Sequence, residues 1–89
     1  MYGYTNDATY HAMLHVDSNY SLVKAIEHVC ELKGTNARSD VYDIIQFFVY
    51  NNNDVREELL GIALSDVNIN ELVDNYNDYM QECEEDMYN

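Results

Sequence analysis

The side chains whose type and spacing best suggest a function are carboxylates near the C-terminal end of the chain. Residues 68–89 contain seven apolar residues at helical spacing and no Lys or Arg. On a helix, those apolar residues share one face and the acids occupy the other. We expect the acidic face to bind a basic surface. The residues assigned to it are Asp74, Asp78, Glu82, Glu85 and Asp86, with Asp54, Glu57 and Glu58 as a second patch.

An acidic row of this kind is unusual for a helix that serves stability alone. Like charges at i, i+4 repel by a few tenths of a kcal/mol per pair, and a stabilising surface would mix the two signs. The row advances about 6 Å per charge, whereas duplex DNA carries one phosphate per roughly 1.7 Å of axis. One such helix is too sparse to imitate a duplex, so we expect it to act with the Asp54–Glu58 turn or with a second copy. The alternative is a solvated face that only aids solubility.

The sequence gives little support for metal binding, phosphate binding or catalysis. His11 and His15 are spaced i, i+4 with Asp7 one turn earlier, but a structural zinc site needs four ligands and no Cys-x-x-Cys or second His pair completes one. We interpret them as partly exposed polar residues. The sequence contains no calcium-binding loop, no Gly-rich phosphate loop and no nucleophile–base set at motif spacing. We therefore expect that the protein is not an enzyme and that it binds no cofactor and no metal.

Nine tyrosines form the second unusual feature. Tyr42, Tyr50 and Tyr79 lie off the main apolar stripes. Tyrosine is enriched at protein interfaces because it combines contact area with a polar tip. These tyrosines either contact a partner or lie at the edges of the core, and the sequence favours neither. Tyr79, next to the acidic row, is included among the expected partner-binding residues.

Composition limits the class of protein. The 89 residues are enough for a single domain, and the absence of Pro with only three Gly favours helices. The net charge of −13 is segregated, with −1 over residues 1–39 and −12 over residues 40–89. Such a chain does not bind nucleic acid directly or approach an anionic membrane. Cys30 and Cys83 fall on apolar faces and are expected to be buried free thiols. We expect a soluble protein of the cytoplasm.

Periodicity and capping residues predict an all-α fold, a single domain over residues 1–89 that forms a compact bundle of four to five short helices. Helices are expected over residues 7–16, 20–33 and 41–50, then from a cap at Asn53, and finally over residues 68–89. Polar loops are expected at residues 35–38 and 51–53. Gly34 is expected to end the second helix, and Asn68 to cap the last.

The N-terminal residues carry a resemblance to a known group of proteins. Gly3-Tyr4, Asn6 and Thr9-Tyr10, followed by Leu14, Val16 and Asn19, resemble the start of small uncharacterised proteins common in phages and plasmids. Their pattern is Gly-Tyr-x-Asn-x-x-Thr-Trp, then Leu-Trp-Ile and Asn; this chain has Tyr10 and His15 in place of the two tryptophans. The resemblance covers about the first quarter of the chain and implies a mobile-element origin. In size and charge the chain is also similar to phage-encoded acidic inhibitors, the anti-CRISPR and anti-restriction DNA mimics.

Two functions follow as hypotheses. The first is an inhibitor whose acidic face blocks the basic nucleic-acid-binding surface of a bacterial host defence protein, either a CRISPR effector or a restriction enzyme. The second is a small helical adaptor or homodimer that binds through apolar and tyrosine surfaces, with acidity serving only solubility. Salt distinguishes them, because binding through exposed charges weakens as ionic strength rises.

Overall fold

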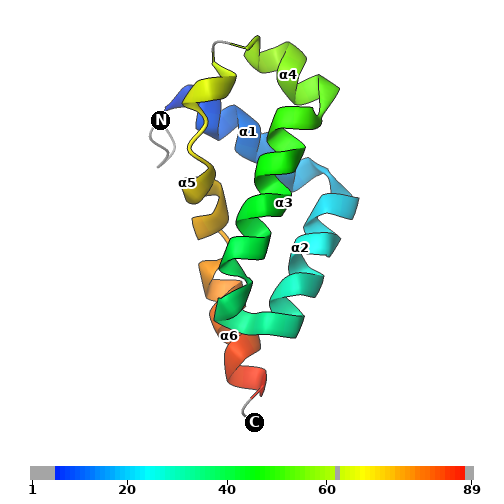
Figure 1. Ribbon diagram of the computed structural model, residues 1–89, viewed down its shortest axis with the longest axis vertical. Coiled ribbons are helices and arrows are strands. Elements are labelled where there is room, and N and C mark those ends of the chain that lie inside the picture. The colour runs from blue at the N-terminus through cyan, green and yellow to red at the C-terminus, as the bar shows by residue number, and fades with distance from the viewer. Residues whose placement is uncertain (1–5, 62, 88–89) are drawn as a thin grey trace.

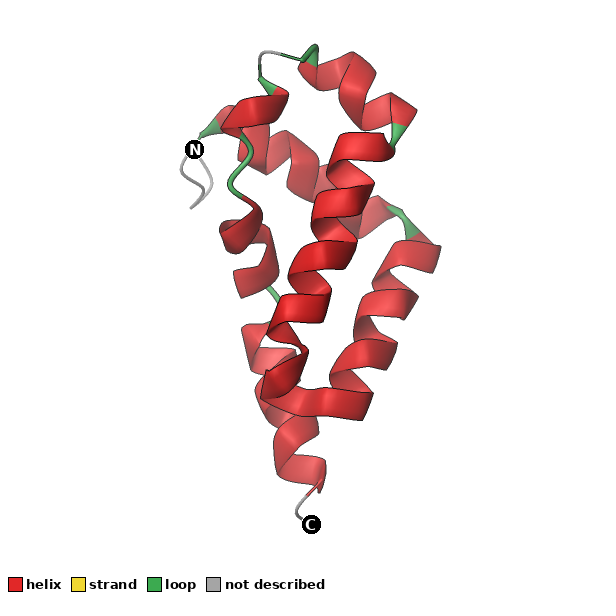
Figure 2. Ribbon diagram, viewed as in Figure 1, coloured by secondary structure: helices red, strands yellow, loops and turns green. Residues whose placement is uncertain are grey.

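The computed structural model describes residues 6–61 and 63–87, and all secondary structure in those ranges is helical. Figures 1 and 2 show the arrangement. In chain order the elements are α1 Asp7–Ser18, α2 Tyr20–Lys33, the 3-10 turn η1 Gly34–Ala37, α3 Arg38–Asn51, α4 Asn53–Leu59, the 3-10 turn η2 Leu64–Asp66, α5 Ile69–Asp74 and α6 Asn77–Met87. The predicted all-α bundle is confirmed. Residues 3–5 of the N-terminal pattern lie outside the described ranges.

Asparagine side chains start four of these helices. Asn6, Asn19, Asn52 and Asn68 each accept a hydrogen bond from a backbone N–H in the first turn that follows. A short amide oxygen satisfies an N–H that has no partner within the helix, which is why Asn is favoured there. The predicted cap at Asn68 is confirmed. The predicted cap at Asn53 is wrong by one residue, because Asn52 accepts from two N–H groups and Asn53 is already helical.

Two expected boundaries also differ. The polar loop expected at residues 35–38 is the 3-10 turn η1, which leads directly into α3 at Arg38. The single C-terminal helix is divided into α5 and α6 by a turn at residues 75–76. The sequence there is Asn-Tyr-Asn-Asp, whose short polar side chains compete with helical hydrogen bonds. The Asn77 amide donates to the Asp74 carboxylate across the turn, which holds the break in place.

The helices form an elongated molecule with principal extents of 45, 24 and 19 Å. α3 runs through the middle and packs against α1, α2, α4 and α5, while α6 packs against α2 and η1. α4 therefore lies at one end of the long axis and α6 at the other (Figure 1). Gly34 ends α2 as predicted, with its N–H bonded to the carbonyl of Cys30.

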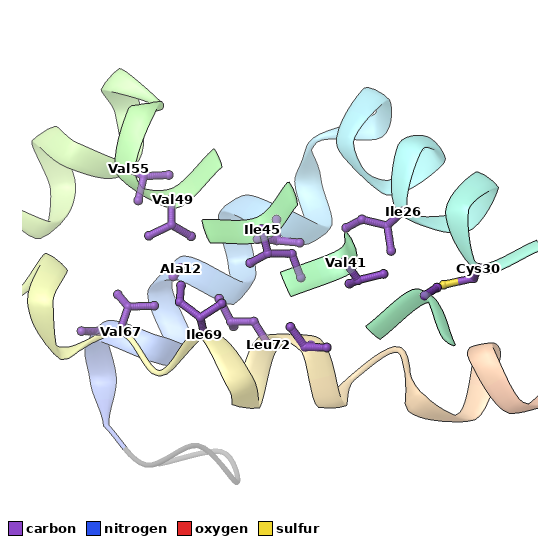
Figure 3. Packing of buried hydrophobic residues seen from close by; sticks show 14 of the residues in the cluster. Ala12, Ile26, Cys30, Val41, Ile45, Val49, Val55, Val67, Ile69 and Leu72 are labelled. Carbon is purple, nitrogen blue, oxygen red and sulfur yellow. The ribbon is translucent and has the colours of Figure 1, made fainter. Parts of the chain in front are cut away.

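The core is a single cluster along α3 (Figure 3). Val41, Ile45 and Val49 are fully buried at four-residue steps on one side of α3. The cluster continues into α5 through Leu72, which is 1% exposed. The buried polar residue Thr9 is satisfied, because its hydroxyl donates to Asn6 and accepts from the backbone N–H of Asn68. This contact ties α1 to the start of α5.

The burial of Leu72 leads to a stability prediction. Leu72→Ala leaves a cavity between α5 and α3, and we expect it to lower the free energy of unfolding by about 2–5 kcal/mol. Leu32→Ala is the matched control, because Leu32 is 64% exposed and its truncation should change stability by less than about 0.5 kcal/mol. Urea unfolding followed by circular dichroism measures both. Equal midpoints for the two variants would contradict the described packing of α5.

Candidate functional site

The outer face of α6 carries a cluster of exposed carboxylates. Asp78, Glu82, Glu85 and Asp86 are exposed, and their spacing places them within an arc of about 100° around the helix. None of them bonds to another residue in the described part of the chain. The four charges span about 12 Å of helix axis, or one per 3–4 Å. This is close to the 3.4 Å per phosphate of a single DNA strand, and denser than the i, i+4 row expected from the sequence.

The opposite side of α6 fixes the helix to the bundle. Met80 and Cys83 are buried, and α6 approaches η1 so closely that a Cβ added to Gly34 would lie 2.7 Å from the Cβ of Glu84. The Thr35 hydroxyl donates to the Glu84 carboxylate at 2.5 Å. Glu84 is therefore half-buried and bonded within the chain, whereas the acids one-third of a turn away face solvent. These contacts on the packed side of α6 fix the direction in which the acidic face points.

Tyr79 also belongs to this attachment. Its ring is half-buried against the core, and its hydroxyl donates to the Glu31 carboxylate on α2 at 3.0 Å. Burial, and then the bond to Glu31, raise the pKa of the Tyr79 hydroxyl above its usual range. Tyr79 thus links α6 to α2. The Tyr79 hydroxyl is therefore already bonded within the chain, and its contact with a partner stays a prediction.

The other tyrosines divide between the two alternatives. Tyr42 and Tyr76 are partly buried and pack against the core. Tyr20 and Tyr50 are 74% and 39% exposed. Among the described tyrosines, some therefore lie at the edges of the core and others at exposed positions. Tyr2, Tyr4 and Tyr88 lie outside the described residues.

Asp74 differs from the other predicted acids because it has a cation beside it. The Arg38 guanidinium donates to the Asp74 carboxylate at 2.7 Å and to the Asn77 amide oxygen at 2.8 Å. Asp74 remains 53% exposed, so solvent screens the pair and its contribution to stability is small. The interaction does neutralise this end of the row. Although residues 68–89 contain no Lys or Arg, Asp74 is paired with a cation from α3.

The second acidic patch lies on α4, at the other end of the molecule from α6 (Figure 1). Asp54 and Glu57 are exposed. Glu58 is bonded to both predicted polar histidines of α1, with its carboxylate 3.0 Å from His11 Nδ1 and in contact with His15 Nε2. The tertiary structure therefore does not bring the two predicted patches together. One protomer presents them as separate surfaces.

The histidine–glutamate contact was missed by the sequence analysis, although the i, i+4 spacing of His11 and His15 was the available signal. That spacing places both rings on one side of α1, where a single carboxylate from α4 can reach them. Among the described residues, no three His, Cys, Asp or Glu side chains are arranged to hold a metal ion. The contact links α1 to α4.

Acid should weaken this link. The hydrogen bond to His15, and then the nearby histidine charges, lower the pKa of Glu58 below its ordinary value of 4.5. Because the folded-state pKa lies below the unfolded one, the contact stabilises the fold above about pH 4.5 and that stabilisation is lost as the pH falls further. We expect Glu58→Gln to reduce the acid dependence of the thermal midpoint. Glu57→Gln, an exposed neighbour, should leave it unchanged; equal profiles for both variants would contradict the contact.

Both cysteines are buried and free, as predicted. Burial, and then the proximity of Cys83, raise the pKa of the Cys30 thiol to about 11. A thiol in that environment is mostly protonated at neutral pH and is a poor nucleophile. No helix in the described part of the chain is both long and apolar enough to cross a membrane.

A further surface feature, on α3, was not recognised from the sequence. Phe47 is 71% exposed, and it falls off the apolar stripe formed by Val41, Ile44, Ile45 and Phe48. The signal was the size of the apolar residue at a position that faces away from the core.

No protein family model, curated protein or solved structure matches this chain.

Proposed function

We propose that this protein is an inhibitor encoded by a phage or other mobile element, and that it blocks the basic nucleic-acid-binding surface of a host defence protein. The observation that carries the proposal is the α6 face, where four exposed carboxylates have no partner within the described chain. The N-terminal resemblance supports the mobile-element origin. The target class is a CRISPR effector or a restriction enzyme in the bacterial cytoplasm.

The mechanism is occlusion. Asp78, Glu82, Glu85 and Asp86 pair with Lys and Arg side chains that otherwise hold phosphates, so the target cannot bind nucleic acid. The net charge of −13 attracts a basic groove over a distance and speeds the encounter. Because α6 is attached through Met80 and Cys83, its backbone is already in place before binding, and conformational entropy is lost mainly by the carboxylate side chains. No catalysis is involved.

The α4 patch plays a different part in this proposal. The α4 helix, which carries Asp54 and Glu57, lies at the far end of the molecule from α6 (Figure 1), and Glu58 contacts two histidines. A groove on the target that accommodates α6 would also contact α4 only if it extended along the whole length of the molecule. The α6 face is therefore the primary contact, and α4 adds long-range attraction.

The alternative function is an adaptor or homodimer that binds through apolar surface. The observation that favours it is the exposure of Phe47 and Tyr50 on α3. This alternative assigns the acidic residues to solubility alone. The two functions therefore place the partner contact on different surfaces, the inhibitor on α6 and the adaptor or homodimer on α3.

Capture from bacterial lysate tests the inhibitor proposal. With the chain immobilised, we expect a nucleic-acid-binding protein to be retained at low salt and released by high salt and by added duplex DNA. Release by DNA is the decisive result, because it requires that the chain and DNA compete for one surface. Retained proteins that neither salt nor DNA releases would count against occlusion and favour the apolar alternative.

A further inference from the structure

The outer face of α3 combines a projecting side chain with hollows on both sides of it. Phe47 is 71% exposed and separates a hollow of about 540 Å³ from one of about 430 Å³. The larger hollow has an apolar wall of Leu22, Ile44 and Phe48. The smaller one is bordered by Tyr50. A bulky aromatic knob and a hollow suited to such a knob therefore lie next to each other on one surface.

This face also lies in the least acidic part of the chain. Residues 20–51, which comprise α2, η1 and α3, contain three bases and four acids, a net of −1 out of −13. The three bases are already paired, Lys24 with Glu27, Lys33 with Asp40 and Arg38 with Asp74. Asp43 is the carboxylate that lines both hollows. A basic partner is attracted far more strongly to α6 than to this face.

We propose that a second copy of this chain docks on the α3 face, with the two α3 helices antiparallel and related by a two-fold axis near Phe47. In a two-fold interface the same patch serves both subunits, so it must be complementary to itself. The knob and adjacent hollow meet that requirement, because each Phe47 enters the larger hollow of the other copy. Approach through this face also keeps most of the negative charge of each copy away from the contact.

Charge decides in favour of the antiparallel direction. In an antiparallel pair centred on Phe47, the residue four positions before it faces the residue four positions after it on the other copy. Asp43 then lies opposite Asn51, whose amide can donate a hydrogen bond to a carboxylate. In a parallel pair, Asp43 would lie opposite Asp43 of the second copy, and the two carboxylates would repel. The apolar part of the face is small, so we expect a dissociation constant on the order of micromolar.

Sedimentation equilibrium of the full chain over a range of concentrations tests the dimer. We expect Phe47→Asp to weaken dimerisation by at least about 30-fold, the change typical of an interface hot spot. Leu60→Asp is the matched control, since Leu60 is 75% exposed on another part of the surface and receives the same new charge. Circular dichroism confirms that both variants are folded. A chain that stays monomeric throughout, or equal effects of the two substitutions, would overturn the proposal.

A charge exchange tests the direction of packing. Asn51→Asp should weaken the dimer, because it places a carboxylate opposite Asp43 of the other copy. Adding Asp43→Lys should restore it, because the introduced ammonium group then faces the introduced carboxylate across the axis. Within one chain these positions are separated by about 12 Å along the helix, so restoration requires contact between copies. Failure of Asp43→Lys to restore the dimer would overturn the antiparallel arrangement.

Salt separates this inference from the proposed function, on which it does not rest. Higher ionic strength screens repulsion between two chains of charge −13 and should leave the dimer intact or strengthen it. Target binding through α6 should weaken under the same change. Each property is measured in the absence of the other, so either can fail alone. A dimer that dissociates as salt rises would contradict assembly through the apolar α3 face.

Discussion

Reversing Asp78, Glu82 and Glu85 to lysine weakens target binding by about two orders of magnitude, at about 1 kcal/mol for each lost contact. The three substitutions change the net charge from −13 to −7 and place cations on the face that meets the basic groove. These side chains are exposed and have no partner in the described chain, so the fold should be retained. Binding to the captured target is measured by calorimetry or surface plasmon resonance at fixed salt.

The control for this experiment changes the same amount of charge elsewhere. Asp17→Lys, Asp54→Lys and Glu57→Lys also give a net charge of −7, but these residues lie on α1 and α4. They should reduce affinity only modestly, through weaker long-range attraction. If both triple variants lose the same affinity, total charge and not the α6 face determines binding. Asp74 is omitted because reversing it would also break its ion pair with Arg38.

The second large effect is expected from Gly34→Ala, which should lower the free energy of unfolding by about 3 kcal/mol or more. Gly34 has φ +59° and ψ −132°, a backbone conformation that side chains with a Cβ rarely adopt. The new Cβ would also lie 2.7 Å from the Cβ of Glu84 and 3.0 Å from its Cα. Because the backbone of α6 is involved, the helix must move away from η1.

Gly61→Ala tests a positive φ at a position without a close contact. Gly61 has φ +54°, but a Cβ there would meet nothing within 4 Å. Its substitution therefore carries only the conformational cost of about 1–2 kcal/mol. A larger loss for Gly34→Ala includes both the close approach of α6 to η1 and the backbone strain at its ψ of −132°. Equal losses of stability would contradict that approach, and faster hydrogen exchange in α6 of the Gly34→Ala variant would support it.

Local features of the fold were predictable because they depend on neighbours in the chain. Helical periodicity located α1, α2 and α3 to within a few residues. The Asn68 cap was predictable from one side chain and the N–H groups just after it. The turn that divides α5 from α6 was missed because the apolar stripe continues across it: Val73 and Met80 are both buried. The helical spacing of apolar residues does not reveal a break when those residues stay on the core side across it.

The candidate site was predictable in part, for the same reason. Asp78, Glu82, Glu85 and Asp86 share one face of α6, and helix geometry alone places them together. Contacts between distant segments were not predictable. Arg38 reaches Asp74 across 36 positions, and Tyr79 reaches Glu31 across 48. Pairings of this kind depend on how the helices cross, which the spacing of residues within one helix does not determine.

The sequence by itself determined the helical fold, the segregation of charge and the acidic face of α6, because each follows from the order of residues along one helix. Only the tertiary structure decided which acids are free, since that depends on the packing of α1 against α4 and of α3 against α5. It left the four outer carboxylates of α6 exposed, paired Asp74 with Arg38 and Glu58 with two histidines, and separated the two acidic patches along a 45 Å axis. It also placed Phe47 outside the core, because the side of α3 that carries it faces away from the other helices.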